Sequence, residues 1–117
     1  MAYQSFEELD VWKKACRLCV NLYNILNDCK DYLLKDQMSR AAISIASNIA
    51  EGAERDSKQE YIRFLHIAKG SAGELRTQLY IADKIRLVRP EERQQLCIEL
   101  IEISKMLHGL IKSMKKA

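Results

Sequence analysis

Apolar residues recur at alternating spacings of three and four between residues 9 and 26, and this rhythm restricts the segment to an α-helix packed in a bundle. One seam contains Leu9, Trp12, Cys16, Cys19, Tyr23 and Leu26. A second seam lies about 110° further round the helix, at roughly 100° per residue, and contains Val11, Ala15, Leu18, Leu22 and Ile25. We assign the first seam to the core. The second faces either further helices of the same bundle or another subunit, and we predict the subunit interface.

Three more segments follow with helical periodicity. We expect helices at about 6–28, 33–55, 58–87 and 90–115. Ser57 and Glu60 fit a capping box before the third helix, and Pro90 suits the first turn of the fourth because its missing N–H costs nothing there. With only four Gly and one Pro, the chain has few residues for the tight turns of a β-rich fold. Residues 1–117 therefore predict one all-α domain, an up-down-up-down antiparallel four-helix bundle.

Polar residues form a ribbon along the second helix and a comparable ribbon along the third. If the hairpin turns near Asp56, Ser44 lies level with Gly70 and Ser71, and small residues such as Gly70 and Gly73 let the two backbones approach closely. We predict a hydrogen-bonded polar seam between these helices, composed of Gln37, Ser44, Asn48, Glu51, Arg63, Ser71, Glu74 and Gln78. The alternative is that both ribbons are simply the solvated sides of surface helices.

Four blocks of the chain resemble one protein family. They are FEELDVWKKA (6–15), QMSRAAISIASNIAEG (37–52), FLHIAKGSAGELRTQL (64–79) and KMLHGLIKSMKK (105–116). Together they resemble the four-helix-bundle proteins encoded in intervening sequences of bacterial 23S rRNA genes, to which the accessory variability determinant proteins of diversity-generating retroelements are similar. The resemblance implies a bundle that assembles as a ring, commonly a homopentamer. In the retroelement relatives the ring is a basic accessory to a reverse transcriptase and binds nucleic acid.

Basic residues are the candidate phosphate contacts. The formal net charge is +3 at pH 7, so five copies at +3 each would carry +15. The candidates are Lys13, Lys14, Arg17, Arg40, Lys112, Lys115 and Lys116. The chain departs from the family at Ala46, where Pro is frequent, and at Ser39, where a second basic residue usually precedes Arg40. No aromatic stacking platform is evident, so we expect RNA or DNA to be bound through charge and shape.

Metal and catalytic chemistry find little support. Cys16 and Cys19 form C-x-x-C inside a helical seam, and a zinc site lacks two further ligands at suitable spacing. Two carboxylate pairs, Glu51 with Glu54 and Glu99 with Glu102, are the basis for an alternative Mg²⁺-dependent nucleotide pyrophosphohydrolase. Arg63 would neutralise Glu51 in such a site. We assign no catalytic, metal or cofactor residue and expect a non-enzymatic protein.

The expected setting is the cytoplasm. No apolar run reaches the roughly 18 residues of a membrane span, and the first residues, MAYQSFEELD, lack the features of a secretory signal. We therefore predict reduced thiols and no membrane contact. The leading hypothesis is a homo-oligomeric, nucleic-acid-associated accessory. The alternative is a scaffold whose ring docks a reverse transcriptase or another protein without binding nucleic acid.

Overall fold

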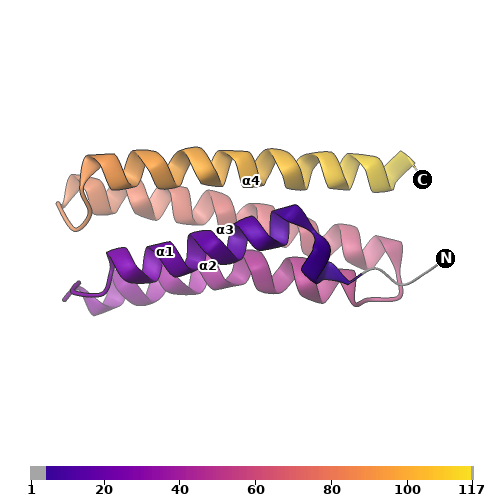
Figure 1. The fold of residues 1–117 in the computed structure, drawn as a ribbon, viewed down its shortest axis with the longest axis horizontal. Coiled ribbons are helices and arrows are strands. Elements are labelled where there is room, and N and C mark those ends of the chain that lie inside the picture. Colours follow the sequence, from indigo (N-terminus) through magenta and orange to yellow (C-terminus); the bar gives the residue numbers. More distant parts are fainter. Residues whose placement is uncertain (1–4, 117) are drawn as a thin grey trace.

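Four helices account for nearly all of the computed structural model, which describes residues 5–116. They are α1 (Asp10–Ile25), α2 (Tyr32–Ala53), α3 (Lys58–Lys84) and α4 (Pro90–Lys116), and a short 3₁₀ turn, η1 (Phe6–Glu8), precedes α1. Helices adjacent in sequence run antiparallel and form a rod of 49 × 20 × 19 Å (Figure 1). No strand occurs within residues 5–116. The expected all-α four-helix architecture is confirmed.

Side-chain caps define where the helices begin. The Asp31 carboxylate accepts a hydrogen bond from the Leu34 N–H at 3.0 Å, and the Ser57 hydroxyl accepts one from the Glu60 N–H at 3.2 Å. Each cap satisfies a backbone donor that has no partner within its helix. The first helix begins at Asp10 rather than near residue 6, because η1 turns the chain before Leu9 adopts an extended conformation.

The end of α3 uses an unusual residue. Arg86 has φ 65°, the left-handed conformation that most often belongs to glycine at the C-terminus of a helix. The Leu87 N–H reaches back to the Ala82 carbonyl at 2.8 Å, which satisfies one of the last carbonyls of the helix. The chain can then turn into α4, which begins at Pro90 as predicted.

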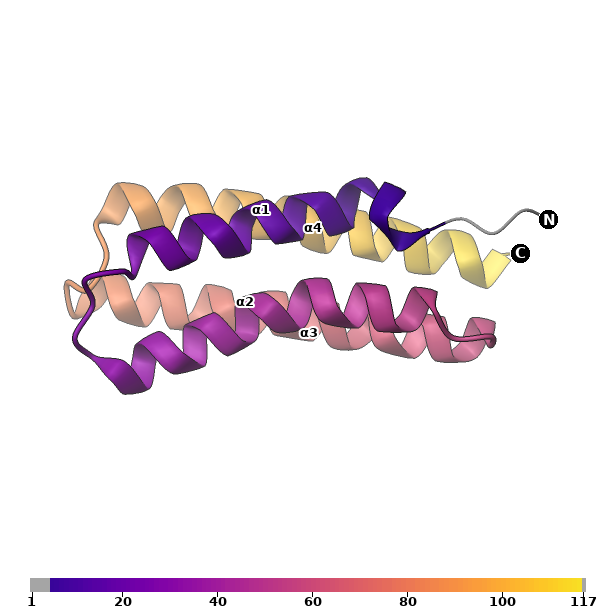
Figure 2. The same cartoon turned by 60° about the horizontal axis from the view of Figure 1, so that its bottom comes forward.

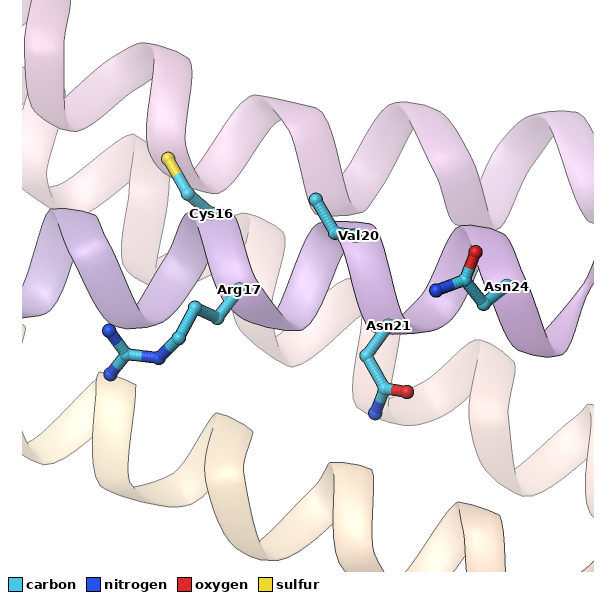
Figure 3. Close-up of a pocket in the computed structure, with 5 residues that line it drawn as sticks. All are labelled: Cys16, Arg17, Val20, Asn21 and Asn24. Carbon is cyan, nitrogen blue, oxygen red and sulfur yellow. The ribbon is translucent and has the colours of Figure 1, made fainter.

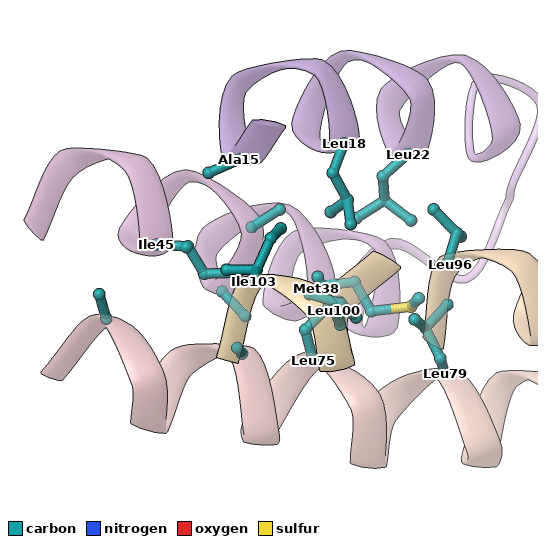
Figure 4. Close-up of a cluster of buried hydrophobic side chains, with 14 of the residues drawn as sticks. Ala15, Leu18, Leu22, Met38, Ile45, Leu75, Leu79, Leu96, Leu100 and Ile103 are labelled. Carbon is teal, nitrogen blue, oxygen red and sulfur yellow. The ribbon is translucent and has the colours of Figure 1, made fainter. Parts of the chain in front are cut away.

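The core runs the length of the bundle and contains side chains from all four helices (Figure 4). Its largest fully buried members from α1 and α2 include Leu18, Leu22, Met38 and Ile45. Leucines and isoleucines from α3 and α4 meet them, among them Leu75, Leu79, Leu96, Leu100 and Ile103. At roughly 25 cal/mol per Å² of apolar surface removed from water, this burial is the main stabilising contribution.

The core reverses the predicted roles of the two seams on α1. Val11, Ala15, Leu18 and Leu22, assigned above to a subunit interface, are each at most 4% exposed, and Ile25 packs half-buried against the same core. That assignment is wrong, because these side chains point into the bundle and have almost no surface left for another subunit.

In the other seam, which was assigned to the core, Leu26 is buried as predicted, at 1% exposed, and the remaining residues lie at the edge of the core. Trp12, Cys16 and Cys19 are half-buried, and Tyr23 is 48% exposed. The Phe6 ring of η1 packs edge-on against Trp12, with ring centroids 5.2 Å apart, and covers one end of this seam. Both seams have the same period, so the sequence pattern alone could not decide which of them faces inward.

Close approach of α2 and α3 depends on a different glycine from those predicted. A Cβ added at Gly70 or Gly73 would meet no atom within 4 Å, so neither glycine is needed for the packing of the hairpin. At Gly52 an added Cβ would lie 2.7 Å from the Phe64 Cβ. Gly52 therefore lets α2 pack directly on Phe64 near the turn of the hairpin.

Figure 2 shows the α2–α3 hairpin on one side of the bundle and α1 and α4 on the other; α2 and α3 pack most extensively against each other, and α4 packs more extensively on α3 than on α1. Within the described part of the chain, no helix is both long enough and apolar enough to cross a membrane.

Candidate nucleic-acid interface

The second half of α4 carries positive charge without any negative charge. After Glu102 no carboxylate occurs through Lys116, the end of the helix. The basic side chains of this stretch are all exposed, and spacings of mostly three and four place them on the outer side of the helix; they are Lys105, His108, Lys112, Lys115 and Lys116. Lys115 and Lys116 in the last turn also complement the negative end of the helix dipole. The predicted candidates Lys112, Lys115 and Lys116 thus lie in one exposed basic stretch.

Two of the predicted phosphate contacts are occupied by carboxylates. Lys14 Nζ lies 3.0 Å from Glu102 Oε2, an ion pair that joins α1 to α4. Arg40 Nε lies 2.9 Å from Asp36 Oδ2 within α2. Both pairs reduce the charge that these residues present to a ligand, and Arg40 is on a different helix from the basic stretch of α4.

The remaining predicted contacts, Lys13 and Arg17, are exposed on α1. Arg17 lines a pocket on the outer side of this helix together with Cys16, Val20, Asn21 and Asn24. Figure 3 shows Arg17 and Asn21 extending toward α4, whereas Cys16 and Val20 lie on the other side of the helix. Because residues of one helix alone line this pocket, it is an open surface rather than a cleft between helices.

The surface along which α3 packs against α4, which we call the α3–α4 groove, contains basic residues that are absent from the candidates above. Lys69 Nζ lies 3.5 Å from His108 Nδ1 across this groove. An ammonium group can only donate, so the imidazole nitrogen is its acceptor there. The two residues are 39 positions apart, and only the register of the two helices brings them together.

Arg76 lies further along the same groove. Its Nε is buried and has no hydrogen-bond partner within the described residues. Burial raises the pKa of the neighbouring Cys97 thiol, while the guanidinium groups of Arg93 and Arg76 act in the opposite direction. Arg76 therefore lies close to α4. Arg93 differs from Arg76 because its Nε meets the Asp83 carboxylate at 3.0 Å.

The predicted polar seam between α2 and α3 contains a hydrogen-bonded centre. The hydroxyl groups of Ser44 and Ser71 lie 2.9 Å apart, and the Asn48 amide donates to both the hydroxyl and the carbonyl of Ser44 at 2.8 Å. Ser71 is only 8% exposed, so this bond satisfies a hydroxyl that water barely reaches. These three residues form a hydrogen-bonded structural contact between the helices.

The charged members of the predicted seam pair within their own helices. Arg55 binds Glu51 at 3.0 Å and Arg63 binds Glu60 at 2.9 Å, so the expected meeting of Glu51 with Arg63 is not an ion pair. The hydrogen bond from Arg63 lowers the pKa of Glu60 and raises that of Arg63. Both guanidinium groups also lie over the Phe64 ring, within 5.0 Å of its centroid.

The last three predicted seam residues lie toward the other end of the hairpin. Gln37 and Gln78 line one groove between α2 and α3, and the Gln78 Oε1 is buried with no hydrogen-bond partner among residues 5–116. Glu74 is exposed to solvent. The polar seam is therefore hydrogen-bonded at Ser44, Asn48 and Ser71, whereas at this end the Gln78 Oε1 has no hydrogen-bond partner among the described residues.

Metal binding has no site in the described part of the chain. No group of three or more His, Cys, Asp or Glu side chains within residues 5–116 has the proximity needed to hold a metal ion. The four cysteines are free thiols, and burial raises the pKa of Cys16, Cys19 and Cys97. Protonated thiols are poor metal ligands and poor nucleophiles.

The chain is similar to known proteins in sequence and in fold. A family model described as 23S rRNA-intervening sequence protein matches residues 7–109. A crystal structure of a protein with unknown function from the S23 ribosomal protein family of Bacteroides thetaiotaomicron has 26% sequence identity and a TM-score of 0.82, covering 87% of this chain and 98% of that chain. No curated protein matches the chain. The matched residues include all of α1, α2 and α3 and most of α4.

Proposed function

The chain belongs to the 23S rRNA-intervening sequence protein family, and from this premise we propose that it is a non-enzymatic, homo-oligomeric bundle that associates with nucleic acid. The observation that supports this proposal is the basic stretch of α4, which carries Lys112, Lys115 and Lys116 without a carboxylate. Binding through such a surface is electrostatic and largely independent of base sequence.

Oligomerisation has support from apolar side chains that the single chain leaves in water. Val20 is 62% exposed, Tyr32 72% and Leu33 74%. Tyr32 lines a surface pocket with Tyr23, and Leu33 lines another with Ile81 and Ile85; exposed apolar side chains grouped in this way are typical of sites that contact another protein. We propose that these residues, rather than the buried seam of α1, contribute to contacts between copies, and that the oligomer is the homopentamer implied by the family resemblance. Five copies would then concentrate +15 of formal charge in one particle.

The test is binding of a short RNA duplex and of a DNA duplex of the same sequence, measured by fluorescence anisotropy as salt increases. Lys112→Gln/Lys115→Gln/Lys116→Gln removes three charges from α4. A matched control, Lys30→Gln/Lys84→Gln/Arg86→Gln, removes three charges from the opposite end of the bundle. Because each lost phosphate contact lowers the slope of log K against log salt by about 0.9, we expect the α4 variant to lower it by about 2.7.

The control should change the slope far less, since Lys30, Lys84 and Arg86 lie at the end of the bundle away from the basic stretch of α4 and are flanked in sequence by Asp28, Asp31 and Asp83. Equal losses in the two variants would contradict a localised interface. Absence of binding by the unaltered protein at about 50 mM salt would contradict nucleic-acid association altogether.

A second candidate is a protein-interaction scaffold. A groove between α2 and α3 favours it, because apolar side chains dominate its lining, namely Leu33, Leu34, Ile81 and Ile85. Such a groove fits the apolar face of a partner segment. A partner retained after nuclease treatment, and lost on Ile81→Asp, would support the scaffold over the nucleic-acid accessory.

A further inference from the structure

Two side-chain contacts set the register of α3 against α4. Asp83 meets Arg93 at 3.0 Å near one end of the groove, and Lys69 meets His108 at 3.5 Å nearer the other end. Positions on α3 that are seven residues apart return to nearly the same side of the helix, so Arg76 lies between Lys69 and Asp83 on the side that faces α4. The groove is therefore lined by several charged side chains in a known order.

The charges along this groove do not balance. Asp83 is the single carboxylate on the facing rows of α3 and α4 within the described residues, and its partner is Arg93. Lys69 and Arg76 have no carboxylate within ion-pair distance among residues 5–116. The groove thus presents a row of uncompensated positive charge, which attracts an anion.

Arg76 and Lys69 are each incompletely satisfied. A buried guanidinium nitrogen without a hydrogen-bond partner carries a desolvation cost, and native proteins normally satisfy such groups. The Lys69 ammonium has a nitrogen of another basic residue as its neighbour, where a phosphate oxygen would be a stronger acceptor. An anion beside Lys69 would provide that acceptor, and its charge would also compensate the Arg76 guanidinium without contacting the buried Nε.

We infer that the α3–α4 groove is a binding site for the phosphate groups of a nucleic-acid backbone, held by Lys69, Arg76 and His108. The choice of nucleic acid as the ligand rests on the proposed function. Lys69 and His108 lie level with each other, and α3 and α4 run antiparallel, so Arg76 lies seven residues from this level in one direction and Lys115 seven residues in the other. The row therefore extends over about 21 Å at 1.5 Å per residue. That length matches about six phosphates of one strand, at about 3.4 Å per charge.

Open space adjoins this row at Gly73. Gly73 lies between Lys69 and Arg76, and an added Cβ there would meet nothing within 4 Å. No side chain at this position stands between the ligand and the two cations. Lys112 and Lys115 then continue the charge toward the end of α4, so the groove joins the basic stretch already described.

The test compares two variants that each lose two positive charges, one pair from within α3 and one pair from its C-terminal end and the turn after it. Lys69→Gln/Arg76→Gln removes them from the groove, and Lys84→Gln/Arg86→Gln removes them from the end of the helix. With a short RNA duplex at about 50 mM salt, we expect the groove variant to bind at least about tenfold more weakly and its salt slope to fall by about 1.8. Thermal unfolding of both variants reports whether the fold is retained. Equal binding by the two variants would overturn the inference.

A second measurement separates this site from the proposed function. Inorganic tripolyphosphate supplies phosphate groups without a nucleic acid, and the ring resonances of His108 report its arrival. We expect these resonances to shift on titration in the unaltered protein and to stay in place in Lys69→Gln/Arg76→Gln. If the duplex does not bind but the His108 shift is seen, the proposed function fails and the anion site stands. If tripolyphosphate leaves His108 unchanged, the anion site is wrong.

Discussion

Replacement of Gly52 by alanine tests the packing of the α2–α3 hairpin at its tightest point. The added Cβ would lie 2.7 Å from the Phe64 Cβ, 3.1 Å from the Tyr61 Cδ1 and 3.2 Å from the Tyr61 carbonyl oxygen. The Phe64 Cβ and the Tyr61 carbonyl are fixed to the backbone of α3, so rotation of a side chain does not relieve the overlap. The two helices must move apart near the hairpin turn.

Two opposing effects set the size of the change. Overpacking that shifts backbone typically costs about 1–3 kcal/mol, whereas alanine is favoured over glycine inside a helix by up to about 1 kcal/mol. The overlap with backbone-anchored atoms exceeds the gain in helix propensity. We expect Gly52→Ala to lower the free energy of unfolding by about 1–2 kcal/mol.

The matched control is Gly70→Ala in the same hairpin. Gly70 is exposed in the middle of α3, and a Cβ there meets no atom within 4 Å. Only the helix propensity changes, so this variant should gain about 0.5–1 kcal/mol. The free energy of unfolding should therefore fall in Gly52→Ala and rise in Gly70→Ala, and the two variants should differ from each other by about 2 kcal/mol.

Urea unfolding followed by circular dichroism measures both free energies, at one fixed protein concentration because oligomers unfold in a concentration-dependent way. The dependence on urea should keep the same slope in all three proteins. If Gly52→Ala is as stable as Gly70→Ala, the close contact between α2 and Phe64 is absent in solution and the described hairpin packing is wrong.

Three further predictions concern stability. Leu18→Ala should cost about 2–5 kcal/mol by leaving a cavity in the core, while Val20→Ala, at a 62% exposed position, should cost less than about 0.5 kcal/mol in a monomer-level unfolding assay; similar costs would contradict the burial of Leu18 in the core. Arg86→Gly should raise the unfolding temperature, by an amount corresponding to about 1 kcal/mol, because glycine adopts the left-handed conformation without strain; a lower temperature would refute this. Burial raises the pKa of the Cys97 thiol above its value in the unfolded chain, so the stability that this thiol contributes is present below the ordinary thiol pKa and is lost as pH rises above about 9. Cys97→Ala should therefore reduce the loss of stability at alkaline pH. If the pH dependence of unfolding is the same in Cys97→Ala and in the unaltered protein, this prediction is wrong.

Much of the fold follows from local pattern. Helical spacing of apolar residues predicts all four helices, and Ser57 and Pro90 mark the beginnings of α3 and α4 because capping is a local interaction. The start of α1 is harder to predict from the sequence, because the 3₁₀ turn at Phe6–Glu8 depends on the Ser5 cap and on packing of Phe6 against Trp12.

The inward face of α1 could not be read from the sequence. Its two seams are both apolar and have the same period, so the choice between them depends on where α2 and α4 lie around α1. The register of α2 against α3 was easier, because one short turn fixes it. It placed Ser44 beside Ser71, and their hydroxyls lie 2.9 Å apart. The distance between two helix backbones does not follow from a sequence pattern in this way, so the close contact at Gly52, rather than at Gly70 or Gly73, emerges only from the structure.

The residues of the candidate interface also differ in whether the sequence alone could identify them. Lys112, Lys115 and Lys116 are visible in the sequence because they follow one another on one helix. Lys69, Arg76 and His108 come from two helices, and each looks like an ordinary surface residue until α3 and α4 are paired. Pairing also removes candidates, since the partners of Lys14 and Arg40 neutralise them.

The most direct test of the central claim, that copies of this bundle assemble and hold nucleic acid by charge, is sedimentation velocity of the unaltered protein mixed with a fluorescent RNA duplex. At about 50 mM salt we expect the label to move with a particle heavier than one chain plus one duplex, and at about 200 mM salt to return to the free duplex. Label that sediments as free duplex at the lower salt, beside protein that sediments as a single chain, would contradict the claim.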